Sequence, residues 1–155
     1  MRVRAAGPDD VPALARLNAE VQALHRAALP DRYSDPPAAA IEDWLRQLLA
    51  DGDTAILLAE QDGAAVGFAV VSRSESAGNL FALPRLSAMV DGLGVAHAAR
   101  RRGAGRALMA AAEELARGWG AASLALDVLS FNRDAVEFYR ALGYEVTKTR
   151  MGKRL

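Results

Sequence analysis

The 155 residues suit one domain with a single core, and 52% hydrophobic with 25% charged residues is ordinary for a folded globular protein. The 19 basic and 19 acidic residues cancel, so no net field favours a nucleic acid or membrane partner, and the lack of cysteine excludes disulfides, thiolate metal sites and a cysteine nucleophile. The chain starts without a signal-peptide core and never approaches the roughly 18 apolar residues of a membrane span, so we expect one cytoplasmic domain over residues 1–155, with no metal.

Residues 1–72 predict a strand, two helices and a hairpin. Apolar residues recur at helical spacing in two stretches separated by a proline-rich loop, and Asp9 or Asp10 is placed to cap the first helix. The run Gln61-Asp62-Gly63 is typical of a hairpin turn. The expected elements are a strand from residue 3, a helix to about residue 28, a helix over 38–50, and strands over 54–60 and 64–72.

Residues 72–155 begin with a stretch over 72–85 that we expect to be a mobile loop or a partner-facing edge. The expected elements after it are a strand over 87–95, a helix over 105–117, a buried strand over 123–128, a helix over 133–142 and a strand over 145–151. Gly92 and Gly94 suggest a bulge or a close backbone approach. Strands interleaved with helices, plus one hairpin, predict a mixed α/β (α+β) sheet in the order strand–helix–helix–strand–strand–strand–helix–strand–helix–strand.

The stretch over 93–108 organises the chain, because an apolar strand there runs into a basic turn that opens onto a helix. Gly103 and Gly105 remove side chains where backbone N–H groups would approach a ligand. The helix directs its unpaired N–H groups and positive dipole end at the same place, and nearby arginines add charge. These features indicate a pyrophosphate-binding turn; a solvated basic turn before an ordinary helix is the alternative.

Two motifs, one in this turn and one at residues 132–144, resemble those of the GCN5-related N-acetyltransferase (GNAT) family. Arg100-x-x-Gly103-x-Gly105 resembles its acetyl-CoA signature, and Asn132-x-x-Ala135-x-x-Phe138-Tyr139-x-x-x-Gly143-Tyr144 looks like its second signature. The resemblance implies a GNAT-like acyl-CoA N-acyltransferase fold whose fourth and fifth strands splay apart around acetyl-CoA. It also implies transfer of an acetyl group to a primary amine, on a small molecule or on a peptide or protein N-terminus, by direct attack in a ternary complex. In one departure, Arg101 stands where many relatives have glycine.

The same resemblance implies which residues contact acetyl-CoA. They come from the end of the fourth strand, the basic turn and the last helix. The set is Leu93, Gly94, Val95, Arg100, Arg101, Arg102, Gly103, Ala104, Gly105, Arg106, Asn132 and Tyr139. Capping of the last helix would by itself explain Asn132.

Tyr139 and Asp91 are the candidate catalytic residues. Tyr139 matches the family's thiolate-protonating tyrosine, and a phenol with an ordinary pKa of about 10 is protonated at neutral pH. An aromatic packing role is the alternative. Asp91 lies where relatives often carry an acidic residue acting through water, and a bulge would decide whether it faces the site.

The acceptor amine would bind near His25 and Tyr33, which flank the first loop where family members bind the acceptor. The alternative for His25 is a packing role without contact to the acceptor. His97 and Asp127 are interpreted as structural residues. The apolar run Leu80-Phe81-Ala82-Leu83 suggests a homodimer contact or a pocket lid.

Two other functions fit part of the pattern. A dinucleotide-binding unit would use Gly103-x-Gly105 with Asp127 as the ribose-binding acid, but Leu108 occupies the third fingerprint position and the approach to the turn is long and basic. The second alternative function is that of a catalytically inactive module that binds acyl-CoA, because Tyr139 alone does not establish turnover.

Overall fold

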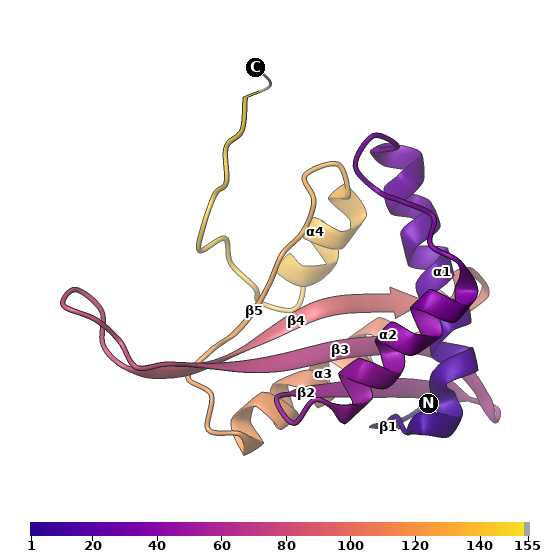
Figure 1. The fold of residues 1–155 in the computed structure, drawn as a ribbon, viewed down its shortest axis with the longest axis horizontal. Helices are drawn as coiled ribbons and strands as arrows, with labels where there is room; N and C mark the ends of the chain where they lie inside the picture. The colour runs from indigo at the N-terminus through magenta and orange to yellow at the C-terminus, as the bar shows by residue number, and fades with distance from the viewer. Residues whose placement is uncertain (154–155) are drawn as a thin grey trace.

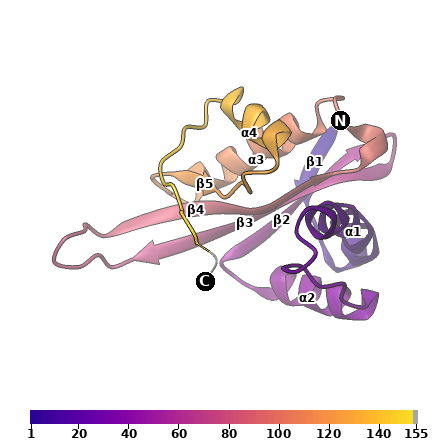
Figure 2. The ribbon, with the colours of Figure 1, turned by 90° about the horizontal axis from the view of Figure 1, so that it is seen from above.

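The computed structural model describes residues 1–153 and has three layers. A five-stranded sheet lies between two pairs of helices, with α1 and α2 on one face and α3 and α4 on the other (Figures 1 and 2). The elements are β1 (Arg2–Ala5), the 3-10 turn η1 (Pro8–Asp10), α1 (Val11–Ala28), α2 (Ala38–Ala50), β2 (Thr54–Gln61), β3 (Ala64–Ser76), β4 (Arg85–Val95), the 3-10 turn η2 (His97–Ala99), α3 (Ala104–Gly118), β5 (Leu124–Leu126) and α4 (Arg133–Arg140).

The sheet is mixed, as predicted. Its strand order is β1-β2-β3-β4-β5, with antiparallel pairing through β4 and a parallel pair between β4 and β5. Asp62 and Gly63, at φ 52° and 79°, form the hairpin turn between β2 and β3, so the hairpin prediction is confirmed. The bounds of α2 are those predicted from the sequence.

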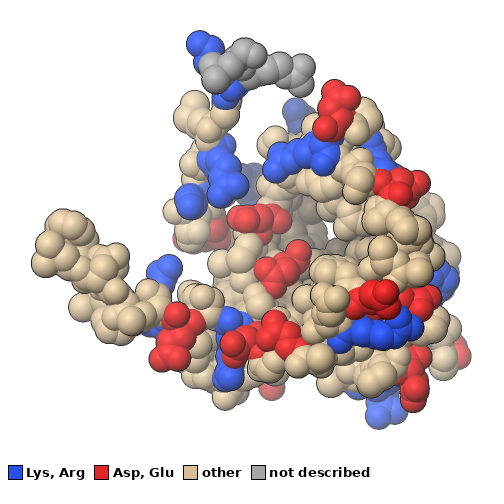
Figure 3. Space-filling model, viewed as in Figure 1, with Lys and Arg blue, Asp and Glu red and all other residues tan. Residues whose placement is uncertain are grey.

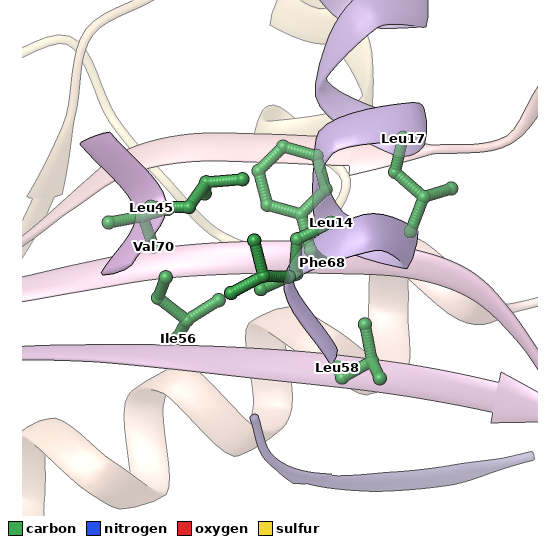
Figure 4. Close-up of a cluster of buried hydrophobic side chains, with 8 residues drawn as sticks. Leu14, Leu17, Leu45, Ile56, Leu58, Phe68 and Val70 are labelled. Carbon is green, nitrogen blue, oxygen red and sulfur yellow. The ribbon is translucent and has the colours of Figure 1, made fainter. Parts of the chain in front are cut away.

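Alternation along β2 and β3 divides the core into two clusters. One cluster faces α1 and α2 and contains Val11, Leu14, Leu17, Leu45, Ile56, Leu58, Phe68 and Val70 (Figure 4). The other faces α3 and contains Leu57, Ala59, Ala69, Val71, Val90, Leu108, Met109 and Ala112. The second cluster is rich in alanine, which lets α3 lie close to the sheet.

Three predictions on secondary structure need correction. The stretch over 72–85 is not simply a loop, because β3 continues to Ser76 and β4 begins at Arg85. The buried strand over 123–128 is reduced to Leu124–Leu126, which is only partly buried. The strand expected over 145–151 is absent, and this segment runs away from the sheet without a strand partner (Figure 1). An alternating sequence makes a strand only where a neighbouring edge is available.

The cap of α1 also differs from the prediction. Asp10 occupies the cap position, but its carboxylate accepts from the Gly7 N–H at 2.8 Å and pairs with Arg4 at 2.7 Å, so it bonds to no helical N–H. No helix of residues 1–153 is long and apolar enough to cross a membrane.

Candidate functional site

The strand β4 has an open edge. It pairs with β5 only over Ala88–Val90, so residues 91–95 have no strand partner on that side. Figure 1 shows the chain after β5 turning away from β4 toward α4. The backbone N–H and C=O groups of this edge are therefore available to a ligand, which is the splay that the family resemblance implies.

Asp91 lies in a β-bulge at the start of the open edge. Val71 of β3 pairs with Val90 and Val70 pairs with Gly92, so Asp91 is the extra residue, and it is exposed. The bulge predicted from the glycines is confirmed. It turns Leu93 and Val95 toward the α3 cluster.

Gly94 brings α1 close to the same strand. A Cβ at this position would lie 2.5 Å from the Phe68 ring and 2.7 Å from Cγ2 of Val21. At Gly92 the nearest atom, also of Phe68, is 3.8 Å away. The predicted close backbone approach is therefore located at Gly94.

The basic turn ends in an α3 N-terminus that no side chain caps. Gly103 is the cap residue and adopts φ 89°, which favours glycine. Ala107 N–H donates to the Gly103 carbonyl, whereas the N–H groups of Ala104, Gly105 and Arg106 precede the helical hydrogen bonds. These donors and the helix dipole favour an anion at this place.

Positive charge around this N-terminus is not neutralised within the protein. Arg100, Arg101, Arg102 and Arg106 are exposed, and none forms an ion pair within residues 1–153. Arg100 Nε donates to the Val95 carbonyl at 3.4 Å, which ties the turn to the end of β4. Four guanidinium groups without a carboxylate partner in residues 1–153 suit a multiply charged phosphate ligand.

The two glycines of the turn have different roles. A Cβ at Gly103 would meet no atom within 4 Å, so that side of the turn is open. A Cβ at Gly105 would lie 3.1 Å from the Phe138 ring. Gly105 therefore also makes room for α4, a packing role that the sequence did not indicate.

The helix α4 carries Tyr139 on the face that packs against the α3 cluster. Asn132 caps α4, because its side chain accepts from the Ala135 N–H at 3.2 Å. The Tyr139 ring lies 5.1 Å from that of Phe138 and 6.0 Å from that of Tyr144, in edge-on geometry. Burial raises the pKa of Tyr139 to about 12, so its phenol is protonated at neutral pH. Leu93 and Val95 of β4 pack on the same cluster.

His25 and Tyr33 meet a third aromatic residue that the sequence reasoning missed. Their rings lie 5.0 Å apart, and the Phe131 ring lies 6.4 Å from His25. Phe131 precedes the α4 cap, so this cluster joins the loop after α1 to the loop after β5. The only sequence signal was an aromatic before a cap residue, which ordinarily indicates local packing. His25 Nδ1 is buried without a partner in residues 1–153, and burial lowers the pKa of the imidazole.

The remaining predicted residues lie at the periphery. The backbone N–H of His97 donates to the Glu20 carboxylate of α1 at 2.9 Å. Asp127 is exposed just beyond β5. Figure 3 shows a hollow between the C-terminal segment and the α1–α2 side, with acidic side chains beneath it. Within residues 1–153, no group of three or more His, Cys, Asp and Glu side chains could hold a metal ion.

Comparisons with known proteins agree with this geometry. The profile of the acetyltransferase (GNAT) family matches residues 18–144. The uncharacterized N-acetyltransferase YhfO of Bacillus subtilis (strain 168) is 32% identical over 145 residues, which is 94% of this chain and 90% of the relative.

Solved structures share the fold at lower sequence identity. The tetramutant of the Bacillus halodurans protein BH1408 superposes with a TM-score of 0.94 at 21% identity, covering 100% of both chains. An aminoglycoside N-acetyltransferase in complex with CoA superposes with a TM-score of 0.73 at 21% identity, covering 99% of this chain and 98% of its own.

Proposed function

Because the chain belongs to the GNAT family of acetyltransferases, we propose that it moves an acetyl group from acetyl-CoA to a primary amine by direct attack in a ternary complex. The acceptor is a small molecule or a peptide N-terminus. The observation that carries this proposal is the open edge of β4 beside the uncapped N-terminus of α3. A dinucleotide-binding unit does not account for membership of this family, and the turnover assay below distinguishes an active enzyme from an inactive acyl-CoA-binding module.

The donor site would be held by backbone and charge together. The N–H groups of Ala104, Gly105 and Arg106 and the free arginines would bind the pyrophosphate. The edge over 91–95 would pair with the amide groups of the pantetheine arm, as an added strand would. Acetyl-CoA supplies an activated thioester to this site.

Two residues would move the protons. Tyr139 would protonate the departing thiolate from its phenol oxygen. Its raised pKa of about 12 makes it a weak acid, but a thiolate in the same water-poor surroundings would also be a stronger base. Asp91, exposed at the bulge, would take the proton of the amine through water.

The acceptor would bind at the aromatic cluster of His25, Tyr33 and Phe131. Aromatic rings attract an ammonium group, and the neutral amine forms when Asp91 removes the proton. The neutral imidazole favoured by burial of His25 adds no repelling charge. This arrangement fits an amine beside an apolar or aromatic group.

Calorimetry with acetyl-CoA tests the donor site. We expect micromolar affinity, about −7 to −9 kcal/mol. Arg106→Gln, at the start of α3, should weaken binding several-fold, because it removes an unpaired positive charge beside the bound phosphates. The matched control is Arg117→Gln at the other end of α3, where the arginine pairs with Glu113 and Glu114, and it should bind as the wild type does. Binding of NAD but not acetyl-CoA would contradict the proposal.

Turnover is tested separately, with a screen of primary amines and peptides and detection of free CoA. His25→Gln and Phe131→Ala should raise KM for the best amine and leave acetyl-CoA affinity unchanged. Asp91→Asn should lower kcat, with the loss reduced at high pH where the amine is already neutral. Release of CoA only by hydrolysis, with every amine tried, would contradict amine acetylation.

A further inference from the structure

The two lysines of the chain lie together in the segment that follows α4. Of the 19 basic residues, all are arginine except Lys148 and Lys153. Both lysines belong to residues 145–153, which form no helix or strand, and both are exposed. Neither pairs with a carboxylate in residues 1–153. The ε-amine of a lysine is a primary amine that an acetyl group can modify, whereas the guanidinium of arginine stays charged and is a poor nucleophile.

This segment starts beside the candidate general acid. The Tyr144 ring lies 6.0 Å from the Tyr139 ring, and the Tyr144 hydroxyl donates to the Glu113 carboxylate of α3 at 3.2 Å. Lys148 follows Tyr144 by four residues. Four extended residues span at most about 14 Å, and the four-carbon stem of lysine adds to this reach. The Lys148 amine is therefore tethered within reach of the Tyr139 phenol.

The segment leads from the α4 side of the sheet toward the side where the acceptor would bind. Figure 2 shows it leaving α4 and crossing toward the side of α1 and α2, and Figure 3 shows its basic side chains beside a hollow with acidic side chains beneath it. The last residues that pair between β4 and β5 are Val90 and Leu126. Asp91 and Asp127 follow them directly, and both are exposed. These carboxylates attract a cationic side chain to the place where the strands part.

We propose that Lys148 is acetylated by its own chain, an inference that rests on the proposed function and gives it an internal acceptor. The ammonium loses one proton to solvent through Asp91 and water, and the neutral Nζ attacks the thioester carbonyl carbon. The N–C bond forms and the C–S bond breaks, with its electron pair passing to sulfur, which takes the proton of the Tyr139 phenol. The second nitrogen proton, lost as the amide forms, restores that phenol. The products are free CoA and an uncharged acetyl-lysine.

Tethering favours Lys148 over amines on other molecules and over Lys153. A group on a short linker acts at an effective concentration on the order of millimolar, and this value falls as the linker lengthens. Lys153 lies nine residues from Tyr144, more than twice the separation of Lys148. The transfer is therefore expected within one chain, and at Lys148 before Lys153.

Mass spectrometry of the full chain incubated with acetyl-CoA tests the proposal, with peptide mapping to locate the label. Lys148 should gain one acetyl group with a rate constant that is unchanged over a tenfold range of protein concentration. Lys148→Arg should lose this label and keep the wild-type rate on the best free amine. Gln47→Lys is the matched control, because it adds an exposed lysine on α2. The introduced lysine should be labelled at least tenfold more slowly than Lys148.

The opposing outcomes are distinct. Tyr139→Phe should slow labelling of Lys148 by about 10²- to 10⁴-fold, as for turnover. Labelling at an unchanged rate in this variant would be uncatalysed and would overturn the proposal, and so would a rate constant that rises with protein concentration. A chain that acetylates a free amine and leaves Lys148 unlabelled would overturn self-acetylation alone, and the proposed function would stand. A chain that acetylates neither would contradict both.

Discussion

At the scale of single residues, aromatic contacts hold the Tyr139 ring in place and do not require its hydroxyl. Tyr139→Phe keeps the ring contacts with Phe138 and Tyr144. We therefore expect the melting temperature and acetyl-CoA affinity to change little, while kcat falls by about 10²- to 10⁴-fold, the usual effect of losing a general acid. Rate measurements with the best amine check this, and turnover near that of the wild type would leave Tyr139 as a packing residue.

The pKa of Tyr139 also predicts the shape of the pH profile. With a pKa of about 12, the phenol stays protonated to well above pH 10. A decline in kcat between pH 8 and about 10 would therefore come from another group and should persist in Tyr139→Phe. A decline with a midpoint near pH 9 that the variant abolishes would contradict this assignment.

Asp10 makes stability depend on acid pH. The Asp10 carboxylate accepts hydrogen bonds from Arg4 and from the Gly7 N–H, and these bonds hold its pKa at about 2, below the ordinary 3.8. The stabilisation is present above pH 4 and is lost as the pH falls toward 2, because the unfolded chain binds the proton first. Asp10→Asn should lower the free energy of unfolding by about 1 kcal/mol at pH 7. Denaturation at several pH values checks this, and a constant difference down to pH 2 would contradict it.

At the scale of elements, the packing of α1 on β4 depends on Gly94. Gly94→Ala should lower the free energy of unfolding by about 1–3 kcal/mol, because the new Cβ would press on Phe68 and Val21 in a filled core. Gly92→Ala is the control two residues away. It should be neutral or stabilising by up to about 1 kcal/mol, since alanine restricts the unfolded chain and meets only ordinary contacts. Equal effects in urea denaturation would contradict this account.

The whole molecule should melt in a concentration-dependent way if Leu80, Phe81 and Leu83, which are exposed between β3 and β4, form the homodimer contact that the sequence suggests. Association stabilises the folded state by mass action, so a tenfold rise in protein concentration should raise the melting temperature by about 1–3 °C. Scanning calorimetry over two decades of concentration checks this. The Phe81→Ser, Leu83→Ser variant should show no such dependence, and a wild type that behaves like it would count against the dimer.

The sequence by itself determined the features that depend on neighbouring residues. Helical spacing determined α2, and the Asp62-Gly63 turn with its positive φ values determined the hairpin. Asn132 begins α4 by capping chemistry that operates within a few residues, and Gly143, at φ 90°, ends the turn that follows the helix at Arg140. The two motifs carried the family for the same reason, because each is a local arrangement of backbone and side chain.

Only the tertiary structure decided where distant segments meet. The open edge of β4 depends on where β5 stops pairing, and the bulge at Asp91 depends on the register with β3. The contact of Gly105 with Phe138 joins two helices, and that of His25 with Phe131 joins α1 to the loop before α4. The strands β3 and β4 project from the molecule as a two-stranded arm because they continue past the ends of their neighbours (Figure 1). Such contacts depend on the pairing and packing of segments far apart in the chain, which the local pattern does not encode.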